Sequence, residues 1–244
     1  MKCKKEFSVL FLLLMIFSLV ACGSQSGVQK SFLLTTSNEN SDSAQQASND
    51  GSTELDGAET EAPSSPNEIF SDSHILVAYF SRAGENYSVG VVEKGNTHII
   101  ADMIAEETGA DMFEIQPVNP YPDTYDECKD VAEKEKNGNA RPEIVGSVGN
   151  MEQYDTVFIG YPIWWGDLPM VVYTFLESYD LSGKTIIPFC THEGSGLSDT
   201  ISMIEKTCPN VTILDGFAIR GSMAQNQQDE AKSNILNWLT ELDY

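Results

Sequence analysis

The sequence has 244 residues, with 37 Asp and Glu against 14 Lys and Arg, and a formal net charge of −23. This charge excludes a nucleic-acid-binding function, because contact with phosphates requires basic patches. It also excludes docking onto anionic lipid by charge alone, so any membrane attachment must have another source.

Residues 1–22 are typical of an export signal rather than of a folded element. A lysine-rich start is followed by an apolar run over 7–21 that is too short to span a bilayer. The run ends in Leu19-Val20-Ala21-Cys22-Gly23, which resembles the lipobox of bacterial lipoproteins. The resemblance implies cleavage before Cys22 and lipidation of its sulfur, which would anchor the protein on the extracytoplasmic face of the cell membrane. An ordinary secretory cleavage, with Cys22 incidental, is the alternative.

Residues 23–72 form a polar, acidic segment in which Lys30 is the only basic residue. The segment lacks a periodic apolar pattern and cannot bury enough surface to offset the entropy of ordering, so we expect a disordered tether. Residues 73–244 have the length of a single domain with its own hydrophobic core.

Buried strands and amphipathic helices alternate along residues 73–244. The predicted strands are 75–80, 111–116, 154–161, 184–190 and 211–219. The predicted helices are 97–109, 121–137, 169–179, one that begins near 197, and 229–242. The alternation predicts an α/β fold, a doubly wound parallel sheet of five strands in the order 2-1-3-4-5 with helices on both faces.

The segment after the first strand predicts a phosphate-binding site. A glycine-containing loop leads from that strand into a helix that begins near Thr97, and helix N-termini bind phosphates. Residues 90–97 fail the ATP-binding pattern G-x-x-x-x-G-K-[ST], because Asn96 stands where the lysine should be. No G-x-G-x-x-G follows the strand, which excludes a dinucleotide site.

In a doubly wound sheet, ligands bind beyond the carboxyl ends of the strands, so we expect the loops after Phe80, Tyr161 and Cys190 to form the site. The motifs Ser81-Arg82-Ala83-Gly84 and Gly95-Asn96-Thr97 together resemble the FMN phosphate loop of flavodoxin-like proteins. Tyr161-Pro162-Ile163-Trp164-Trp165-Gly166-Asp167-Leu168-Pro169 resembles the flavin-contacting loop of that family, and Thr191–Gly196 resembles its second flavin loop. The resemblance extends in order over residues 74–242 and implies a flavodoxin-like fold with FMN as the cofactor.

The resemblance also implies which residues hold the cofactor. The phosphate is assigned to Ser81, Arg82, Asn96 and Thr97. The flavin ring is assigned to Pro162, Ile163, Trp164, Trp165, Thr191, His192, Gly194 and Ser195. Because two adjacent tryptophans cannot both be buried in a loop, we expect one to stack on the ring and the other to pack on the protein. Simple helix capping by Thr97 and a structural role for His192 stay open as alternatives.

Two features depart from the family pattern. Residues 85–95 form an insertion within the phosphate loop, which leaves open which of residues 83–86 reach the phosphate. The loop after Cys190 has no aromatic residue, whereas long flavodoxins often stack a tyrosine there. We therefore expect the flavin to be open on that side.

These patterns predict an FMN-binding redox protein, either an electron carrier or a flavin-dependent reductase. Its redox partner would be a protein or a small acceptor such as a quinone. A flavodoxin-fold ligand-binding module without redox activity is the alternative. A serine hydrolase is excluded, because Ser195 lacks the G-x-S-x-G elbow and no histidine follows it. Cys128, Cys190 and Cys208 lack zinc-site spacing, and a disulfide between two of them stays open.

Overall fold

The computed structural model describes residues 74–244. The predicted signal peptide, 1–22, with its lipidation site Cys22, and the predicted tether, 23–72, lie outside the described residues. Among the helices of the described part, none is both long and apolar enough to cross a membrane.

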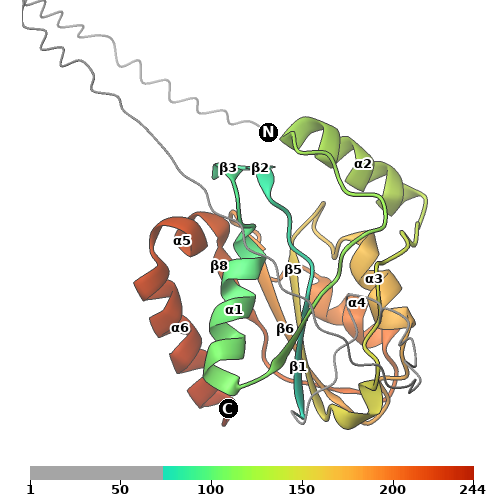
Figure 1. Cartoon of the computed structure of the whole chain (residues 1–244), viewed down its shortest axis with the longest axis vertical. Helices are drawn as coiled ribbons and strands as arrows, with labels where there is room; N and C mark the ends of the chain where they lie inside the picture. The colour runs from blue at the N-terminus through green and yellow to red at the C-terminus, as the bar shows by residue number, and fades with distance from the viewer. Residues whose placement is uncertain (1–73) are drawn as a thin grey trace, which may run out of the picture. The chain divides into compact units, whose positions relative to one another are not determined.

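A parallel sheet forms the centre of the domain, with the strand order β4-β1-β5-β6-β7 and with β8 also paired to β6 (Figure 1). The strands are β1 (Ile75–Tyr79), β4 (Asp111–Glu114), β5 (Thr156–Pro162), β6 (Thr185–His192), β7 (Thr212–Ile213) and β8 (Phe217–Arg220). Because β7 and β8 share the fifth place beside β6, the predicted α/β fold and its order 2-1-3-4-5 are confirmed. Almost every residue of β1, β5 and β6 is buried, as expected for strands covered on both faces.

Helices lie on both sides of the sheet (Figure 1). On one side are α1 (Asn96–Thr108), α5 (Gly221–Asn226) and α6 (Gln228–Glu241), and on the other are α2 (Tyr125–Asn137), α3 (Met170–Glu177) and α4 (Thr200–Thr207), with a short 3₁₀ turn, η1 (Met151–Gln153). Val77 and Phe158 belong to the core shared with α1 and α6, whereas Leu76 and Val157 belong to the core shared with α3. Successive strand residues therefore face opposite cores.

The prediction of one continuous strand over 211–219 is wrong. The chain leaves the sheet at 214–216, between β7 and β8, opposite Pro188 of β6. Proline has no N–H to donate to a neighbouring strand, which accounts for the interruption at this point. The sequence also failed to predict α5, and the helix expected from 197 begins at Thr200.

The insertion at 85–95, together with Gly84, forms an antiparallel hairpin of β2 (Gly84–Asn86) and β3 (Gly90–Val92). Its base is joined to the start of α2. The Glu85 N–H donates to Asp123 O at 2.8 Å, and the Glu85 carboxylate accepts from the Tyr125 N–H at 3.0 Å. Gly84 has a φ of +82°, and a Cβ there would lie 2.7 Å from Asp123 O, so the close approach requires glycine.

Cys128, Cys190 and Cys208 are buried free thiols. Burial raises the pKa of Cys190 to about 12 and that of Cys208 to about 11. Neutral thiols in such surroundings are poor nucleophiles and poor metal ligands. The disulfide that the sequence left open is absent from the described residues.

Candidate functional site

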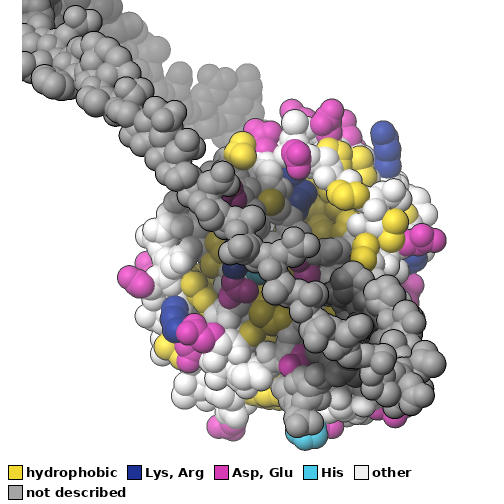
Figure 2. Space-filling view, in the orientation of Figure 1, with side chains coloured by type: hydrophobic (Ala, Val, Ile, Leu, Met, Phe, Trp, Pro, Cys, Tyr) yellow, Lys and Arg dark blue, Asp and Glu magenta, His cyan; other side chains and the backbone are white. Residues whose placement is uncertain are grey.

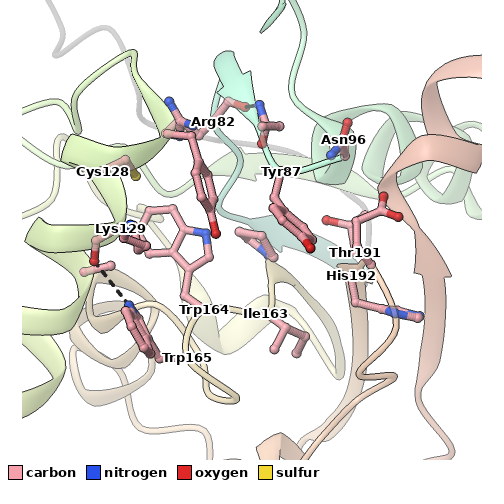
Figure 3. Close-up of a pocket in the computed structure, with 15 residues that line it drawn as sticks. Arg82, Tyr87, Asn96, Cys128, Lys129, Ile163, Trp164, Trp165, Thr191 and His192 are labelled. Atoms are coloured by element: carbon pink, nitrogen blue, oxygen red, sulfur yellow. Dashed lines mark hydrogen bonds between the residues drawn. The ribbon is translucent and has the colours of Figure 1, made fainter. Parts of the chain in front are cut away.

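A cleft of about 270 Å³ lies beyond the carboxyl ends of β1, β5 and β6 (Figure 3). It is lined by Arg82, Asn86, Tyr87, Asn96, Tyr125, Cys128, Lys129, Ala132, Pro162, Ile163, Trp164, Trp165, Thr191, His192 and Glu193. The strand order reverses between β1 and β5, and doubly wound sheets bind their ligands at this point.

Ser81 and Gly95 lie in contact although the hairpin separates them in sequence. A Cβ on Gly95 would come within 2.2 Å of Ser81 Oγ and 2.6 Å of Arg82 O, so a larger residue would push the two segments apart. Gly95 occupies the N-cap of α1 but has no side chain to cap the helix. Ser81 supplies the cap instead, because its Oγ accepts a hydrogen bond from the His98 N–H at 3.1 Å.

Four backbone amides near the start of α1 lack an acceptor in the part of the chain that the structure describes. Among residues 74–244, no group accepts a hydrogen bond from the N–H of Arg82, Ala83, Asn96 or Thr97. The N-terminus of a helix carries about half a positive charge, which favours an anion at this place.

Thr97 and Thr191 join α1 to the end of β6. Both residues are buried, and their Oγ1 atoms lie 2.8 Å apart. One hydroxyl donates to the other, so the pair retains one O–H that can donate elsewhere. Thr191 lines the cleft directly, whereas Thr97 does not.

Arg82 is held by backbone carbonyls of the segment before α2. Its Nη1 donates to Pro122 O at 2.8 Å and to Asp123 O at 3.0 Å, and its Nη2 donates to Glu85 O. The side chain therefore fixes the loop after β1 in place. Asn96 Oδ1 accepts a hydrogen bond from Gln225 Nε2 at 2.9 Å, and its own NH₂ group has no acceptor among the described residues.

A tight turn follows β5. The Trp164 N–H donates to Asp167 O and the Asp167 N–H donates to Trp164 O, each at 3.0 Å. The central residues, Trp165 and Gly166, have φ values of +52° and +72°. For a bulky residue the left-handed conformation costs roughly 1–2 kcal/mol. Contacts outside the turn must therefore hold Trp165 in place.

The two tryptophans lie in different surroundings, as their adjacency predicts. Trp164 packs edge-on against Phe80 and Tyr121, with ring centroids 5.2 and 4.9 Å away. Trp165 is 47% exposed, and its Nε1–H donates to Lys129 O of α2 at 3.2 Å (Figure 3). Trp164 is thus held by packing against other aromatic rings, whereas Trp165 is held at the surface by a hydrogen bond.

Lys136 of α2 holds the same turn from a second point. Its Nζ donates to Trp165 O at 2.6 Å and lies 3.4 Å from Oδ2 of the buried Asp167. Asp167 Oδ1 accepts from the Tyr173 hydroxyl at 2.8 Å. The turn after β5 is therefore fastened to α2 and to α3.

His192 lines the cleft at the end of β6, and its Nδ1 accepts a hydrogen bond from the Gly194 N–H at 2.8 Å. Partial burial and the nearby Arg220 lower the pKa of His192, and Glu193 opposes the shift. The Glu193 carboxylate accepts from the Ser222 N–H at 2.7 Å and lies 3.6 Å from Arg220 Nη1. The neutral ring, with its proton on Nε2, is favoured by these contacts.

Acidic side chains are spread over the visible face of the domain, with few lysines and arginines among them (Figure 2). Lys129, which lines the cleft, is paired with Asp126 at 2.7 Å. The site therefore offers an anion its backbone amides and hydroxyls rather than unpaired cations.

The residues assigned from the sequence are divided between the cleft and its surroundings. Those that line the cleft are Arg82, Asn96, Pro162, Ile163, Trp164, Trp165, Thr191 and His192. Ser81 and Thr97 instead organise the start of α1, and Gly194 and Ser195 are exposed residues outside the cleft lining.

One side of the cleft, formed by residues of the β2–β3 hairpin and of α2, was not predicted from the sequence. The missed lining residues there are Tyr87, Tyr125, Cys128, Lys129 and Ala132, and Glu193 was missed in the loop after β6. Asn86, one of the residues whose contact the sequence left open, also lines the cleft. An aromatic residue within a polar insertion was the available signal for Tyr87. The residues of α2 carry no such signal, because their position depends on tertiary packing.

Comparison with known proteins places this fold in a family. A family model described as Flavodoxin matches residues 74–238. A proposed flavoprotein from Bacteroides eggerthii DSM 20697 is 31% identical with a TM-score of 0.51, and the match covers 64% of this chain and 96% of that one. A proposed flavoprotein from Bacteroides uniformis ATCC 8492 is 29% identical with a TM-score of 0.53, over 66% of this chain and 96% of that one.

A flavoprotein from Lactobacillus acidophilus NCFM, solved in complex with FMN, is 20% identical with a TM-score of 0.48, over 63% of this chain and 97% of that one. No curated protein matches the sequence. The family model spans more than half of the chain, from β1 into α6, and the chain therefore belongs to the flavodoxin family.

Proposed function

We propose that the cleft binds FMN, with the phosphate at the N-terminus of α1 and the flavin ring against the turn after β5. The observation that carries this proposal is the set of amides without acceptors at Arg82, Ala83, Asn96 and Thr97. Amide donors at a helix N-terminus suit a terminal phosphate and make a lysine unnecessary. The donor set therefore fits the phosphate monoester of FMN.

Side chains supplement these amides. Ser81 Oγ accepts from His98, so its own proton is free to donate to a phosphate oxygen. The Asn96 NH₂ group and the free O–H of the Thr97–Thr191 pair are further donors. Arg82 would act by fixing the loop, since its guanidinium is already bound to backbone carbonyls.

The ring end of the cleft is apolar and aromatic. Pro162, Ile163 and Trp164 would contact the flavin ring, and Thr191 and His192 would approach it from the end of β6. Bound FMN would supply the transfer of electrons or hydride. The chain would orient the ring and limit the access of water.

We propose accordingly that the protein is a redox protein, either an electron carrier or a reductase of a small acceptor such as a quinone. The test is the visible absorption spectrum of the purified full-length protein after reconstitution, with mass identification of the released flavin. Bound FMN that is reduced by dithionite and reoxidised by a quinone supports the proposal. Absence of bound flavin contradicts it, and bound FMN without reversible reduction favours the binding-module alternative.

We propose further that Cys22 carries a lipid and holds the domain outside the cytoplasmic membrane, with residues 23–72 as the tether. The lipobox-like end of the apolar run supports this location. A flexible coil of about 50 residues would reach roughly 40 Å. The full-length protein should enter the detergent phase on phase separation, and Cys22→Ala should move it to the aqueous phase without changing the flavin spectrum. Wild-type protein in the aqueous phase would contradict the anchor.

A further inference from the structure

We propose that Tyr87, in the turn of the β2–β3 hairpin, is a second aromatic wall of the cleft and positions the flavin ring opposite the floor formed by Trp164. This inference rests on the proposed function. It extends that function to a residue of the insertion, which the motifs in the loops after β1, β5 and β6 do not include.

Tyr87 is a large aromatic side chain that the fold itself hardly uses. It is 60% exposed, yet it lines the cleft. Its ring lies 5.6 Å from that of Tyr125, and its hydroxyl has no hydrogen-bond partner in the described part of the chain. A ring left open to water contributes little to folding, because little of its apolar surface is buried. A planar ligand in the cleft would cover that surface.

The backbone that carries Tyr87 is fixed at the base of the hairpin. Glu85 makes two hydrogen bonds to the segment at the start of α2, through its N–H and its carboxylate. Asn86 Nδ2 donates to Gly84 O at 3.1 Å and to Arg82 O at 3.3 Å. Tyr87 follows Asn86 directly, and its side chain points from the hairpin toward the segment that carries Ile163 and Trp164 (Figure 3).

The loop after β6 provides no aromatic residue for the second face of the flavin ring. Thr191–Gly196, which follows β6, contains no aromatic residue that could stack on a flavin. Trp164 is packed nearly perpendicular to the rings of Phe80 and Tyr121, so it forms a fixed surface of the cleft. A flat ligand has two faces, and Tyr87 is the aromatic residue that the insertion brings to the cleft.

The test is titration of the full-length protein with FMN and with riboflavin, which lacks the phosphate. Tyr87→Ala should weaken the binding of both flavins roughly threefold to tenfold, the range expected for one aromatic pair. The ratio of the two affinities should stay unchanged, because the phosphate end is untouched. Iodide should also quench the bound flavin more strongly in this variant, since one face becomes accessible.

Two variants serve as controls. Tyr87→Phe retains the ring and should bind both flavins within about twofold of wild type. Val91→Ala alters an 81% exposed residue of the same hairpin that does not line the cleft, and it should leave affinity and quenching unchanged. Wild-type affinity and quenching in Tyr87→Ala would overturn the inference, as would an equal loss in Tyr87→Phe or Val91→Ala. Failure of the unsubstituted protein to bind either flavin would overturn the proposed function itself.

Discussion

Gly95 lies against the Ser81 hydroxyl so closely that a Cβ on Gly95 would come within 2.2 Å of Ser81 Oγ. The contact joins the loop after β1 directly to the start of α1. The β2–β3 hairpin, which separates the two in sequence, loops out between them. Each doubling of the length of a flexible loop raises the entropic cost of closing it by only about 0.6 kcal/mol. The hairpin can therefore be accommodated while the two halves of the loop stay together.

Gly95→Ala should separate these halves. Ser81 would have to move and would no longer cap α1 at His98, so we expect a loss of about 1–3 kcal/mol in the free energy of unfolding. FMN affinity should fall at least tenfold, because the amides on both sides of the contact lose their arrangement. Urea unfolding and flavin titration measure the two effects. Gly138→Ala, at the far end of α2, is the control. Wild-type FMN affinity in Gly95→Ala would contradict a phosphate site built from the loop after β1 and the start of α1.

Trp165 should contribute to the site and only modestly to stability. In Trp165→Asn, relief of roughly 1–2 kcal/mol of left-handed strain offsets the lost hydrogen bond to Lys129 O, worth about 1 kcal/mol. The buried half of the indole is lost as well, so we expect a net loss of about 1–2 kcal/mol in the free energy of unfolding. Flavin binding should weaken, because Trp165 lines the cleft. Trp238→Ala, which empties a buried site beside Phe158 and Phe217, should cost about 3–5 kcal/mol. Equal destabilisation by both substitutions in urea unfolding would contradict this account.

The sequence was sufficient to predict the sheet and the floor of the cleft, because β1, β5 and β6 are continuous apolar runs. The doubly wound topology then brings the ends of these strands together, which placed Trp164 and Thr191 at one site. Local pattern and topology carry this information without any knowledge of side-chain contacts.

The remaining wall could not be predicted, because it depends on contacts distant in sequence. The hairpin strands are too short to show a period, and they are positioned by Glu85 bonding to the start of α2. The position of Lys129 and Tyr125 depends on that docking. The interruption between β7 and β8 did have a local signal, Pro188 in the neighbouring strand, but its effect appears only once the pairing is known.

The stability of the protein should depend on the charge of His192. Burial and Arg220 lower its pKa below the ordinary value of 6.5, so the unfolded chain binds more protons than the folded one as the pH falls through 6.5. This group therefore makes the protein less stable toward acid pH. His192→Gln cannot take up the proton, so its loss of stability between about pH 7 and about pH 5 should be smaller. Identical urea-unfolding profiles across that range would show that His192 does not titrate differently on folding.

The three buried cysteines should react slowly with thiol reagents as long as the protein is folded. Cys128, Cys190 and Cys208 are free, and burial raises the pKa of each thiol. They should react slowly with a thiol reagent in the native protein and fully after unfolding in guanidinium without reductant. Mass spectrometry after alkylation counts the modified sites. A mass deficit of two hydrogens with two unmodified cysteines would reveal a disulfide and contradict the structure.

The central claim is that the start of α1 holds the phosphate of FMN, and titration of the full-length protein with FMN and riboflavin tests it most directly. FMN should bind at least tenfold more tightly than riboflavin. Thr97→Val, which removes one hydroxyl of the pair with Thr191 but keeps the side-chain shape, should weaken FMN binding and leave riboflavin binding unchanged. Equal affinity for the two flavins in the wild-type protein would contradict a phosphate site at this helix.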